Sequence, residues 1–522
     1  MDAHYFLMTL RRDSLELLCK INDKLPPLAW VASIEKGKTM VLCGNRVEFF
    51  ENCFVSGAWS GNFEDKLFDK SDWFCGTGGK IDCEKIIFST PTHVTEGLYL
   101  SKCDKQKLVI SNSLYLLMAD LNYHMDPDYQ GYEIDLSTIT LGINDYKKEI
   151  IVLDENDNSA IIKIFYYRNI VINNDNVWNE TVKPSVVPFA DFNDYYSRLQ
   201  DSMIQLQINA NHPKRKYKYG ITSTVSRGYD APCCAVIAKK IGAKTAVTFD
   251  STGKYAQDSG VEIAKTLGFE NIVERSADFY KNSNDFIEAY YLCTGELGAS
   301  ISFSAFSQDF KNNIVFTGER GDSIWNCSDQ NRNNSLCFKT ASLSHLGMSE
   351  KHLWDGSITV PMPLFGATAW ESIYDISNSE EMAPWRLNND YDRPIPRRIC
   401  EQAGLKRTDF GISKHGAGFI YRYDTLKRIK YRMSPYSAKS FENFVEVHRK
   451  PHLLQKLSYF YKMRQFYLFV IADKLKLSKI GITIKYPESE FLIATPNPNT
   501  PRYLIPWASS IMLEKYKKIL GR

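Results

Sequence analysis

The spacing of apolar residues changes near residue 190 of the chain. Before that point, short runs in which apolar and polar residues alternate, such as 39–43 and 108–111, are separated by turns rich in Gly, Asn and Asp. Such alternation is typical of half-buried β-strands. Residues 149–164 contain two of these runs around a polar turn and predict a hairpin. We therefore expect a β-rich domain over residues 1–185.

From residue 190 onward, helical and strand-like patterns alternate. Tyr195, Leu199, Met203 and Leu206 recur at helical spacing. Alternation of this kind predicts βαβ units and a parallel sheet. The expected strands are 219–225, 244–249, 271–274 and 313–316, with helices around 232–241, 260–267 and 286–292 between them.

Two stretches of the chain have a different character. The polar, proline-containing residues 173–188 are expected to be a linker. Beyond about residue 340 the pattern is helical and irregular, and residues 445–476 are basic, aromatic and amphipathic. We interpret this last segment as a packed helix with a solvated basic face, and a membrane-surface or partner-binding helix is the alternative. The expected fold is α/β, with domains 1–185 and 190–522, the second carrying a helical C-terminal extension.

Composition limits the classes of function. The 522 residues include 64 basic and 61 acidic ones, a net charge of +3 that gives no general attraction to nucleic acid. Twelve cysteines without a paired CxxC spacing argue against a metal or disulfide framework and favour a reducing compartment. Because the start lacks signal-peptide features and the chain has no run of 18 apolar residues, we expect a cytoplasmic protein without a membrane span.

The strand expected at 219–225 ends in a turn with phosphate-binding character. Residues 226–231 read Ser-Arg-Gly-Tyr-Asp-Ala and lead into a helix with Pro232 near its first position. Backbone N–H groups at such a turn bind anions. Gly228 lets the backbone approach a phosphate closely, and Asp230 is suited to holding magnesium. The turn predicts a nucleotide phosphate site, although ordinary strand–helix connections share this pattern.

A second turn of the same kind follows the strand expected at 313–316. Residues 317–323 read Thr-Gly-Glu-Arg-Gly-Asp-Ser. Two such turns at the ends of parallel strands face each other across one crevice. Asp230 and Asp322 would then share magnesium on a nucleoside triphosphate. The alternative is a pair of unrelated surface turns.

Together the turns resemble those of the asparagine synthetase family of N-type ATP pyrophosphatases, the PP-loop enzymes. The family's phosphate loop, Ser-Gly-Gly-x-Asp-Ser, is matched by Ser226, Gly228 and Asp230. Its second motif, Gly-(Asp/Glu)-Gly-x-Asp-Glu, is matched by Gly318, Glu319 and Asp322. The resemblance implies magnesium at Asp230 and Asp322. It implies ATP at Ser226, Arg227, Gly228, Tyr229, Asp230, Thr317 and Gly318.

The resemblance extends less specifically over most of the chain. Residues 394–414 resemble the stretch in which family members place a lysine over the reacting carboxylate, here Lys414. Residues 62–78 and 109–114 are similar to the glutaminase-like half of the family. This implies an N-terminal α+β domain related to the N-terminal-nucleophile glutaminases, and a doubly wound parallel-sheet synthetase domain.

The sequence also departs from the family. Glutamine-hydrolysing members expose cysteine as the first mature residue, whereas this chain begins Met-Asp-Ala-His, and Cys19 lies in an apolar, helical-looking pattern. We therefore expect a degenerate glutaminase-like domain that does not supply ammonia. Arg227 replaces a glycine, Ala231 a phosphate-binding serine and Ser323 an acid. Arg227 is expected to add positive charge beside the phosphates.

The function implied is that of an AMP-forming carbon–nitrogen ligase with ATP and Mg²⁺. It would adenylate a small-molecule or peptide carboxylate, release pyrophosphate and pass the acyl group to an amine or free ammonia. Lys414 would stabilise the developing negative charge, and Glu319 would orient a tyrosine or accept the amine proton. Tyr290 and Tyr291 are the candidates for that tyrosine. A homodimer is compatible with this hypothesis.

Two alternatives stay open. One is intramolecular closure, as in β-lactam or macrolactam synthetases, which also lack the N-terminal cysteine. The other is a catalytically silent nucleotide-binding scaffold, which Ala231 and Ser323 favour because both replacements remove ligands. Sulfur transfer to tRNA is disfavoured, since the chain is not predominantly basic and has no catalytic cysteine pair.

Overall fold

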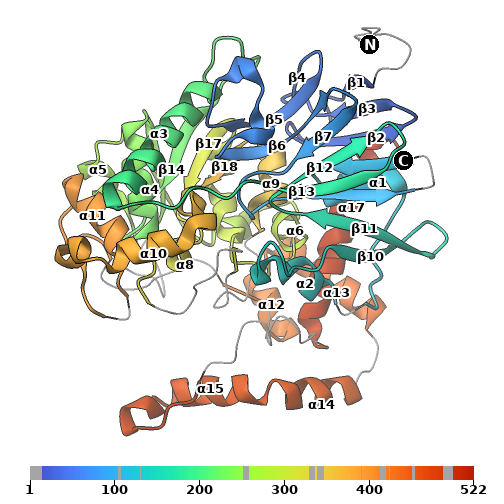
Figure 1. Ribbon diagram of the computed structural model, residues 1–522. Helices are drawn as coiled ribbons and strands as arrows, with labels where there is room; N and C mark the ends of the chain where they lie inside the picture. Colours follow the sequence, from blue (N-terminus) through green and yellow to red (C-terminus); the bar gives the residue numbers. More distant parts are fainter. Residues whose placement is uncertain are drawn as a thin grey trace.

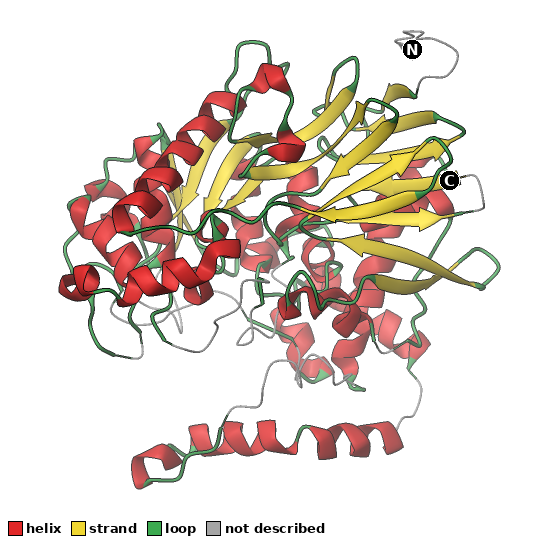
Figure 2. Ribbon diagram, in the orientation of Figure 1, coloured by secondary structure: helices red, strands yellow, loops and turns green. Residues whose placement is uncertain are grey.

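The protein is a mixed α/β molecule, and the part of the chain that the structure describes forms three sheets. The computed structural model in Figure 1 describes residues 15–103, 107–129, 131–250, 258–328, 336–337, 346–389, 391–411, 419–421, 424–449, 453–485 and 498–522. Two sheets of residues 16–182 lie in one half of the molecule, and a parallel sheet lies in the other half (Figure 2). The strand β18 of the parallel sheet packs beside β6 of the first half.

The N-terminal half contains a seven-stranded and a six-stranded sheet, whose neighbouring strands are antiparallel except for β1 and β3. The seven-stranded sheet has the order β1 (Glu16–Ile21), β3 (Lys38–Cys43), β2 (Trp30–Glu35), β9 (Lys107–Ser111), β8 (Leu98–Lys102), β11 (Ser159–Phe165) and β10 (Glu149–Leu153). The six-stranded sheet has the order β13 (Trp178–Val182), β12 (Arg168–Asn173), β7 (Lys85–Ser89), β6 (Phe74–Asp82), β5 (Cys53–Trp59) and β4 (Glu48–Phe49).

Large apolar side chains hold these two sheets face to face. Trp30 of β2 packs against Phe54 of β5 and Phe88 of β7, with ring centroids 4.9 and 5.9 Å apart. Aromatic side chains bury large apolar areas and so contribute strongly to the packing of a core. The helices α1 (Leu114–Leu121) and α2 (Tyr132–Ser137) pack against the seven-stranded sheet. This half is therefore a layered sandwich with helices on one side.

The parallel sheet has five strands, and its order reverses direction at the centre. The order is β16 (Asn271–Arg275), β15 (Thr245–Phe249), β14 (Gly220–Thr224), β17 (Asn313–Thr317) and β18 (Ile358–Pro361). The chain therefore builds outward from β14 on one side and from β17 on the other. In sheets of this kind ligands bind beyond the carboxyl ends of the strands at the point of reversal.

Helices surround the parallel sheet and continue into the C-terminal region. Helix α17 (Leu504–Leu520) returns to the N-terminal half, where it packs on α1 and where Arg522 donates to the carbonyl of Ala119 at 3.1 Å. The remaining helices near the sheet are α3 (Phe192–Ala210), α4 (Asp230–Lys240), α5 (Val261–Thr266), α6 (Ile287–Leu292), α7 (Ser307–Phe310), α8 (Gly321–Ile324), α9 (Met348–Asp355), α10 (Trp370–Asn378) and α11 (Pro394–Gln402). The C-terminal helices are α12 (Leu426–Arg432), α13 (Pro435–His448), α14 (Leu453–Lys462), α15 (Arg464–Lys474) and α17 (Leu504–Leu520).

The structure confirms the predicted α/β alternation and its parallel sheet, and it corrects three details. The region beyond residue 340 also contains a strand, β18, whose four residues are all buried and so carry no alternation. The expected linker contains β13, a sheet-edge strand with mostly polar residues. Cys19 lies in β1 rather than in a helix, because the pairing with β3 outweighs the local pattern.

Candidate functional site

The turn after β14 is held by its own hydrogen bonds. The Ser226 hydroxyl accepts from the N–H of Gly228 at 3.2 Å, and the N–H of Arg227 donates to the carboxylate of Asp258 at 3.2 Å. Helix α4 begins directly afterwards, at Asp230. A β-carbon built on Gly228 would come no closer than 3.4 Å to another atom of the protein. The protein itself thus leaves space at this glycine, on the side where a ligand would approach.

The turn after β17 lies in direct contact with the start of α4. A β-carbon on Gly318 would lie 2.7 Å from the backbone nitrogen of Ala231, and one on Gly321 would lie 2.4 Å from the carboxyl carbon of Asp230. Arg320, between these glycines, has a left-handed backbone with φ of 68°. Only glycine permits this closeness of the two turns. The turns that were predicted to face one another therefore do so.

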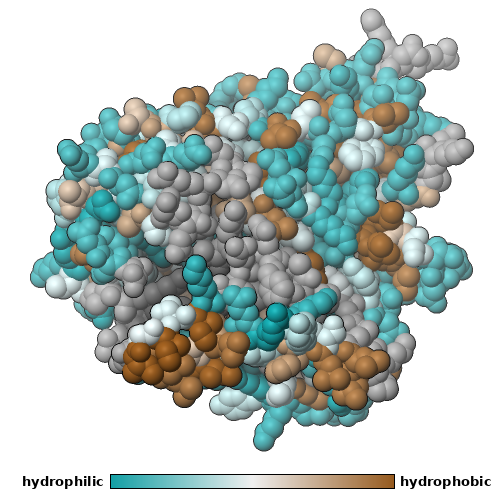
Figure 3. Space-filling model, turned by 60° about the horizontal axis from the view of Figure 1, so that its bottom comes forward, coloured by the Kyte–Doolittle hydropathy of each residue, from teal (hydrophilic) through white to brown (hydrophobic). Residues whose placement is uncertain are grey.

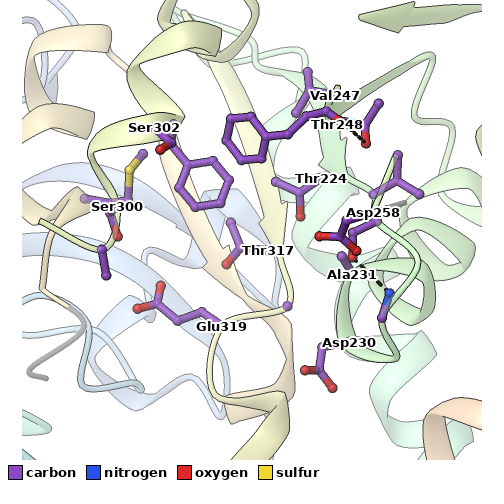
Figure 4. Close-up of a pocket in the computed structure, with 18 of the residues that line it drawn as sticks. Thr224, Asp230, Ala231, Val247, Thr248, Asp258, Ser300, Ser302, Thr317 and Glu319 are labelled. Atoms are coloured by element: carbon purple, nitrogen blue, oxygen red, sulfur yellow. Dashed lines mark hydrogen bonds between the residues drawn. The ribbon is translucent and has the colours of Figure 1, made fainter. Parts of the chain in front are cut away.

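A cavity of about 350 Å³ lies between the two turns. Asp230, Asp258 and Ala231 lie on one side of it, and Glu319 on the other, with its carboxylate directed toward the wall that contains Ser300 (Figure 4). Five large apolar side chains also line the cavity: Phe249, Phe303, Phe306, Phe310 and Met348. The cavity thus combines a polar region at the strand ends with an apolar region, a combination typical of sites for ligands that carry both kinds of group.

Arg393, one residue before α11, is a cation of the polar region. Its guanidinium donates to both carboxylate oxygens of Asp230, at 2.6 Å for Oδ1, and only 5% of the residue is exposed. Burial opposes its charge, but the neighbouring Asp230, Tyr391 and Asp322 raise the pKa of Arg393 above its ordinary value. The two carboxylates that were predicted to hold magnesium therefore lie close to one permanent positive charge.

A second carboxyl group, that of Glu296, lines the cavity near Glu319. Burial, followed by the nearby charge of Glu319, raises the pKa of Glu296 to about 8. Glu296 accepts a hydrogen bond from Ser300 at 3.2 Å. Burial also lowers the pKa of Arg320 to about 10, against the opposing effect of Glu319. At neutral pH, Glu296 is therefore largely protonated while Arg320 keeps its charge.

Some residues proposed from the sequence have other neighbours. The Arg227 guanidinium donates to the carbonyl of Asp409 at 3.2 Å, and Arg227 is not among the residues that line the cavity. The positive charge that it was expected to add beside the phosphates stays a prediction. The Tyr229 ring is buried against Tyr391 at 4.9 Å, where it supports the segment that carries Arg393. The Tyr290 hydroxyl donates to Asp285 rather than to Glu319. Lys414 lies outside the described residues.

Several cavity residues could not be found from the sequence. Phe303, Phe306 and Phe310 come from the short helices η6 (Ile301–Phe306) and α7, and no local motif connects them with the two turns. For the segment that carries Tyr391 and Arg393, the sequence offers only the opposite charges of Asp392 and Arg393 as a signal. Asp258 follows a stretch without a recognisable pattern. These residues become neighbours only through the crossover connections of the parallel sheet.

The arrangement of the carboxylates also indicates how magnesium could be held in the cavity. Among the described residues, no group of three or more His, Cys, Asp and Glu side chains is arranged to hold a metal ion by itself. Magnesium that accompanies a nucleotide needs only one or two protein carboxylates, because phosphate oxygens and water complete its shell. Asp230 and Asp322 line the same cavity and fit this requirement once Asp230 is released from Arg393.

No protein-family model and no curated protein matches this chain. Within the described residues, no helix is both long enough and apolar enough to cross a membrane. Any function assigned to the protein must therefore be argued from the cavity between the two turns.

Proposed function

We propose that the protein is an ATP-dependent ligase that forms an amide bond through an acyl-adenylate. The observation that carries the proposal is the contact between two glycine-containing turns across a cavity at the reversal point of a parallel sheet. Such a position is where α/β proteins bind nucleotides, with phosphates at the start of a helix. The resemblance of both turns to the asparagine synthetase family adds the type of reaction.

The polar region of the cavity would bind the triphosphate. The turn at 226–230 offers backbone N–H groups to the phosphates, and α4 begins there with the positive end of its dipole. Arg393 adds a positively charged side chain. The substrate carboxylate would attack the α-phosphorus, and the bond to pyrophosphate would break. Magnesium held by Asp230 and Asp322 would neutralise the pyrophosphate as it leaves.

The opposite wall would serve the second half of the reaction. An amine attacks the acyl carbon, loses a proton, and AMP leaves. Glu319 lines the cavity and is the residue we assign to accept that proton. Lys414 remains a prediction from the sequence for stabilising the negative charge of this step. The apolar side chains, among them Phe249 and Phe306, would enclose the base or the substrate.

The direct experiment measures nucleotide binding and product formation. The protein, incubated with ATP, Mg²⁺ and a set of carboxylates and amines, should yield AMP and pyrophosphate in equal amounts. Asp230→Asn should reduce turnover at least about 100-fold, since it removes a charged ligand of the magnesium that would neutralise the pyrophosphate. Asp278→Asn, at an exposed carboxylate paired with Lys281, is the matched control and should keep full activity.

Three results would contradict the proposal or part of it. Failure to bind ATP would refute the assignment of the cavity. Release of ADP and phosphate instead of AMP and pyrophosphate would refute adenylation. Unchanged turnover in Asp230→Asn would refute the role of Asp230 at the magnesium.

A silent nucleotide-binding scaffold is the second candidate. The contact of Arg393 with both oxygens of Asp230 favours it, because a bound guanidinium occupies the carboxylate that an active enzyme would offer to magnesium. Binding of ATP that does not depend on Mg²⁺, without AMP formation, would establish this function. Dependence of ATP binding on Mg²⁺ would support the ligase instead.

A further inference from the structure

Helices α14 and α15 form an arm that lies apart from the sheets and the other helices (Figure 1). We use the word arm for residues 453–476. The helices follow each other almost end to end, and Tyr459, Met463 and Phe466 form a small buried cluster of their own. Tyr467, Phe469 and Val470 are half-buried, and the remaining large apolar residues of the arm are exposed. They are Leu453, Leu454, Leu457, Phe460, Tyr461, Leu468, Ile471 and Leu475.

These exposed residues follow a helical spacing. In α14 they recur at intervals of one, three and four residues, so they form one continuous stripe, and in α15 Leu468, Ile471 and Leu475 do the same. Leu453 is 72% exposed and Leu454 is 82% exposed. Figure 3 shows the apolar surface gathered in two patches on the face that the arm forms, with hydrophilic residues between them. Surface helices in a globular protein normally turn such a stripe inward.

The arm is also strongly basic. It contains five basic residues and one acidic residue, a net charge of +4, whereas the whole chain has a net charge of +3. The positive charge of the protein is thus concentrated on this arm. Lys456, Lys462 and Arg464 are exposed beside the apolar stripe.

We infer that the arm binds the surface of a membrane rich in anionic lipids. A helix with an exposed apolar stripe and flanking cations lies in the interface, where the stripe enters the acyl boundary and the cations meet the lipid phosphates. A second copy of the chain is a poorer fit, because two arms of charge +4 repel each other. Nucleic acid is a poorer fit as well, since it offers no partner for exposed aliphatic side chains.

Vesicle flotation of the full-length protein tests the inference. The protein should float with vesicles of phosphatidylcholine and phosphatidylglycerol, remain behind with vesicles of phosphatidylcholine alone, and bind more weakly as salt rises. Hydrogen exchange should show lipid-induced protection confined to the arm. Absence of flotation with the anionic vesicles, or equal binding to both kinds, would overturn the inference.

Amino-acid substitutions test whether the arm, and not another part of the surface, binds the vesicles. Leu453→Ser with Leu457→Ser, and Lys456→Glu with Lys462→Glu, should each weaken vesicle binding about tenfold or more. Two matched control variants should bind the vesicles normally. The apolar control is Ile204→Ser with Ile208→Ser, at the same four-residue spacing on the exposed face of α3. The charge control is Lys24→Glu with Lys311→Glu, at two exposed lysines outside the arm. Unchanged binding of the arm variants, or an arm-dependent dimer without vesicle binding, would refute the assignment. Thermal unfolding of the same variants shows that each has folded, and because this measurement needs no nucleotide the test is independent of the proposed ligase function.

Discussion

The glycines of the two turns serve different purposes. Gly318 is required by the protein itself, since a β-carbon there would collide with the backbone of Ala231 at 2.7 Å. Gly228 has space within the protein and is required only if a ligand approaches. The same substitution at the two positions therefore distinguishes packing from binding.

We predict that Gly318→Ala lowers stability by about 1–3 kcal/mol, because the two turns must move apart. Gly228→Ala should keep the melting temperature within a few degrees of the parent and weaken ATP binding, since Gly228 lines the cavity and the methyl group would take up space at the proposed phosphate site. Thermal unfolding with and without ATP measures both effects. Equal loss of stability in the two variants would contradict this division of roles.

The buried Glu296 gives the site a measurable pH dependence. Because burial and Glu319 raise its pKa to about 8, the folded protein holds a proton that the unfolded chain loses near pH 4.5. The ionisation of Glu296 therefore lowers the free energy of unfolding as pH rises from about 5 to 8. We predict that Glu296→Gln becomes progressively more stable than the parent over this range, by on the order of a few kcal/mol at pH 9. Denaturant unfolding at several pH values tests this, and a pH-independent difference would disprove it.

Helix α17 is joined to two other helices through one buried carboxylate. Glu350 of α9 accepts from Tyr516 of α17 at 2.6 Å and from Ser113, the N-cap of α1, at 2.8 Å. Burial raises the pKa of Glu350 despite these hydrogen bonds. The C-terminal helix is thus part of the packing of the N-terminal sandwich and not an independent extension.

Tyr516→Phe should test this connection. The substitution removes one donor from a buried carboxyl group and should lower the free energy of unfolding by about 1–3 kcal/mol. Tyr431→Phe, at a residue that is 81% exposed, should change it by less than about 0.5 kcal/mol. Urea unfolding of both variants provides the comparison. A loss that is no larger in Tyr516→Phe would mean that the hydrogen bond contributes nothing.

The two halves of the chain are also linked by a buried ion pair. His352 of α9 lies 3.1 Å from Glu96, which precedes β8. Burial disfavours the imidazolium, but Glu96 outweighs that effect and raises the pKa of His352. Burial instead lowers the pKa of His93, on the other side of Glu96, to about 4, so that His93 stays neutral. One charged histidine therefore compensates the carboxylate.

This pair should make the free energy of unfolding depend on pH. A raised histidine pKa stabilises the folded state at low pH, and this stabilisation is lost as pH rises through the folded pKa, above about 6.5. We predict that His352→Gln costs about 3–5 kcal/mol at pH 6 and less at pH 9. Unfolding measured across that range checks the trend, and a cost that grew with pH would contradict it.

The sequence by itself determined the parallel α/β alternation and the two turns, because apolar spacing, glycine and the strand-to-helix transition are local properties. It did not determine β18 or β13, since a fully buried four-residue strand and a polar edge strand lack an alternating pattern. Only the tertiary structure decided that Arg393 contacts Asp230, 163 residues away, and that Phe303 lines the same cavity. Such contacts follow from how strands order in a sheet, which depends on packing across the chain and not on any one segment.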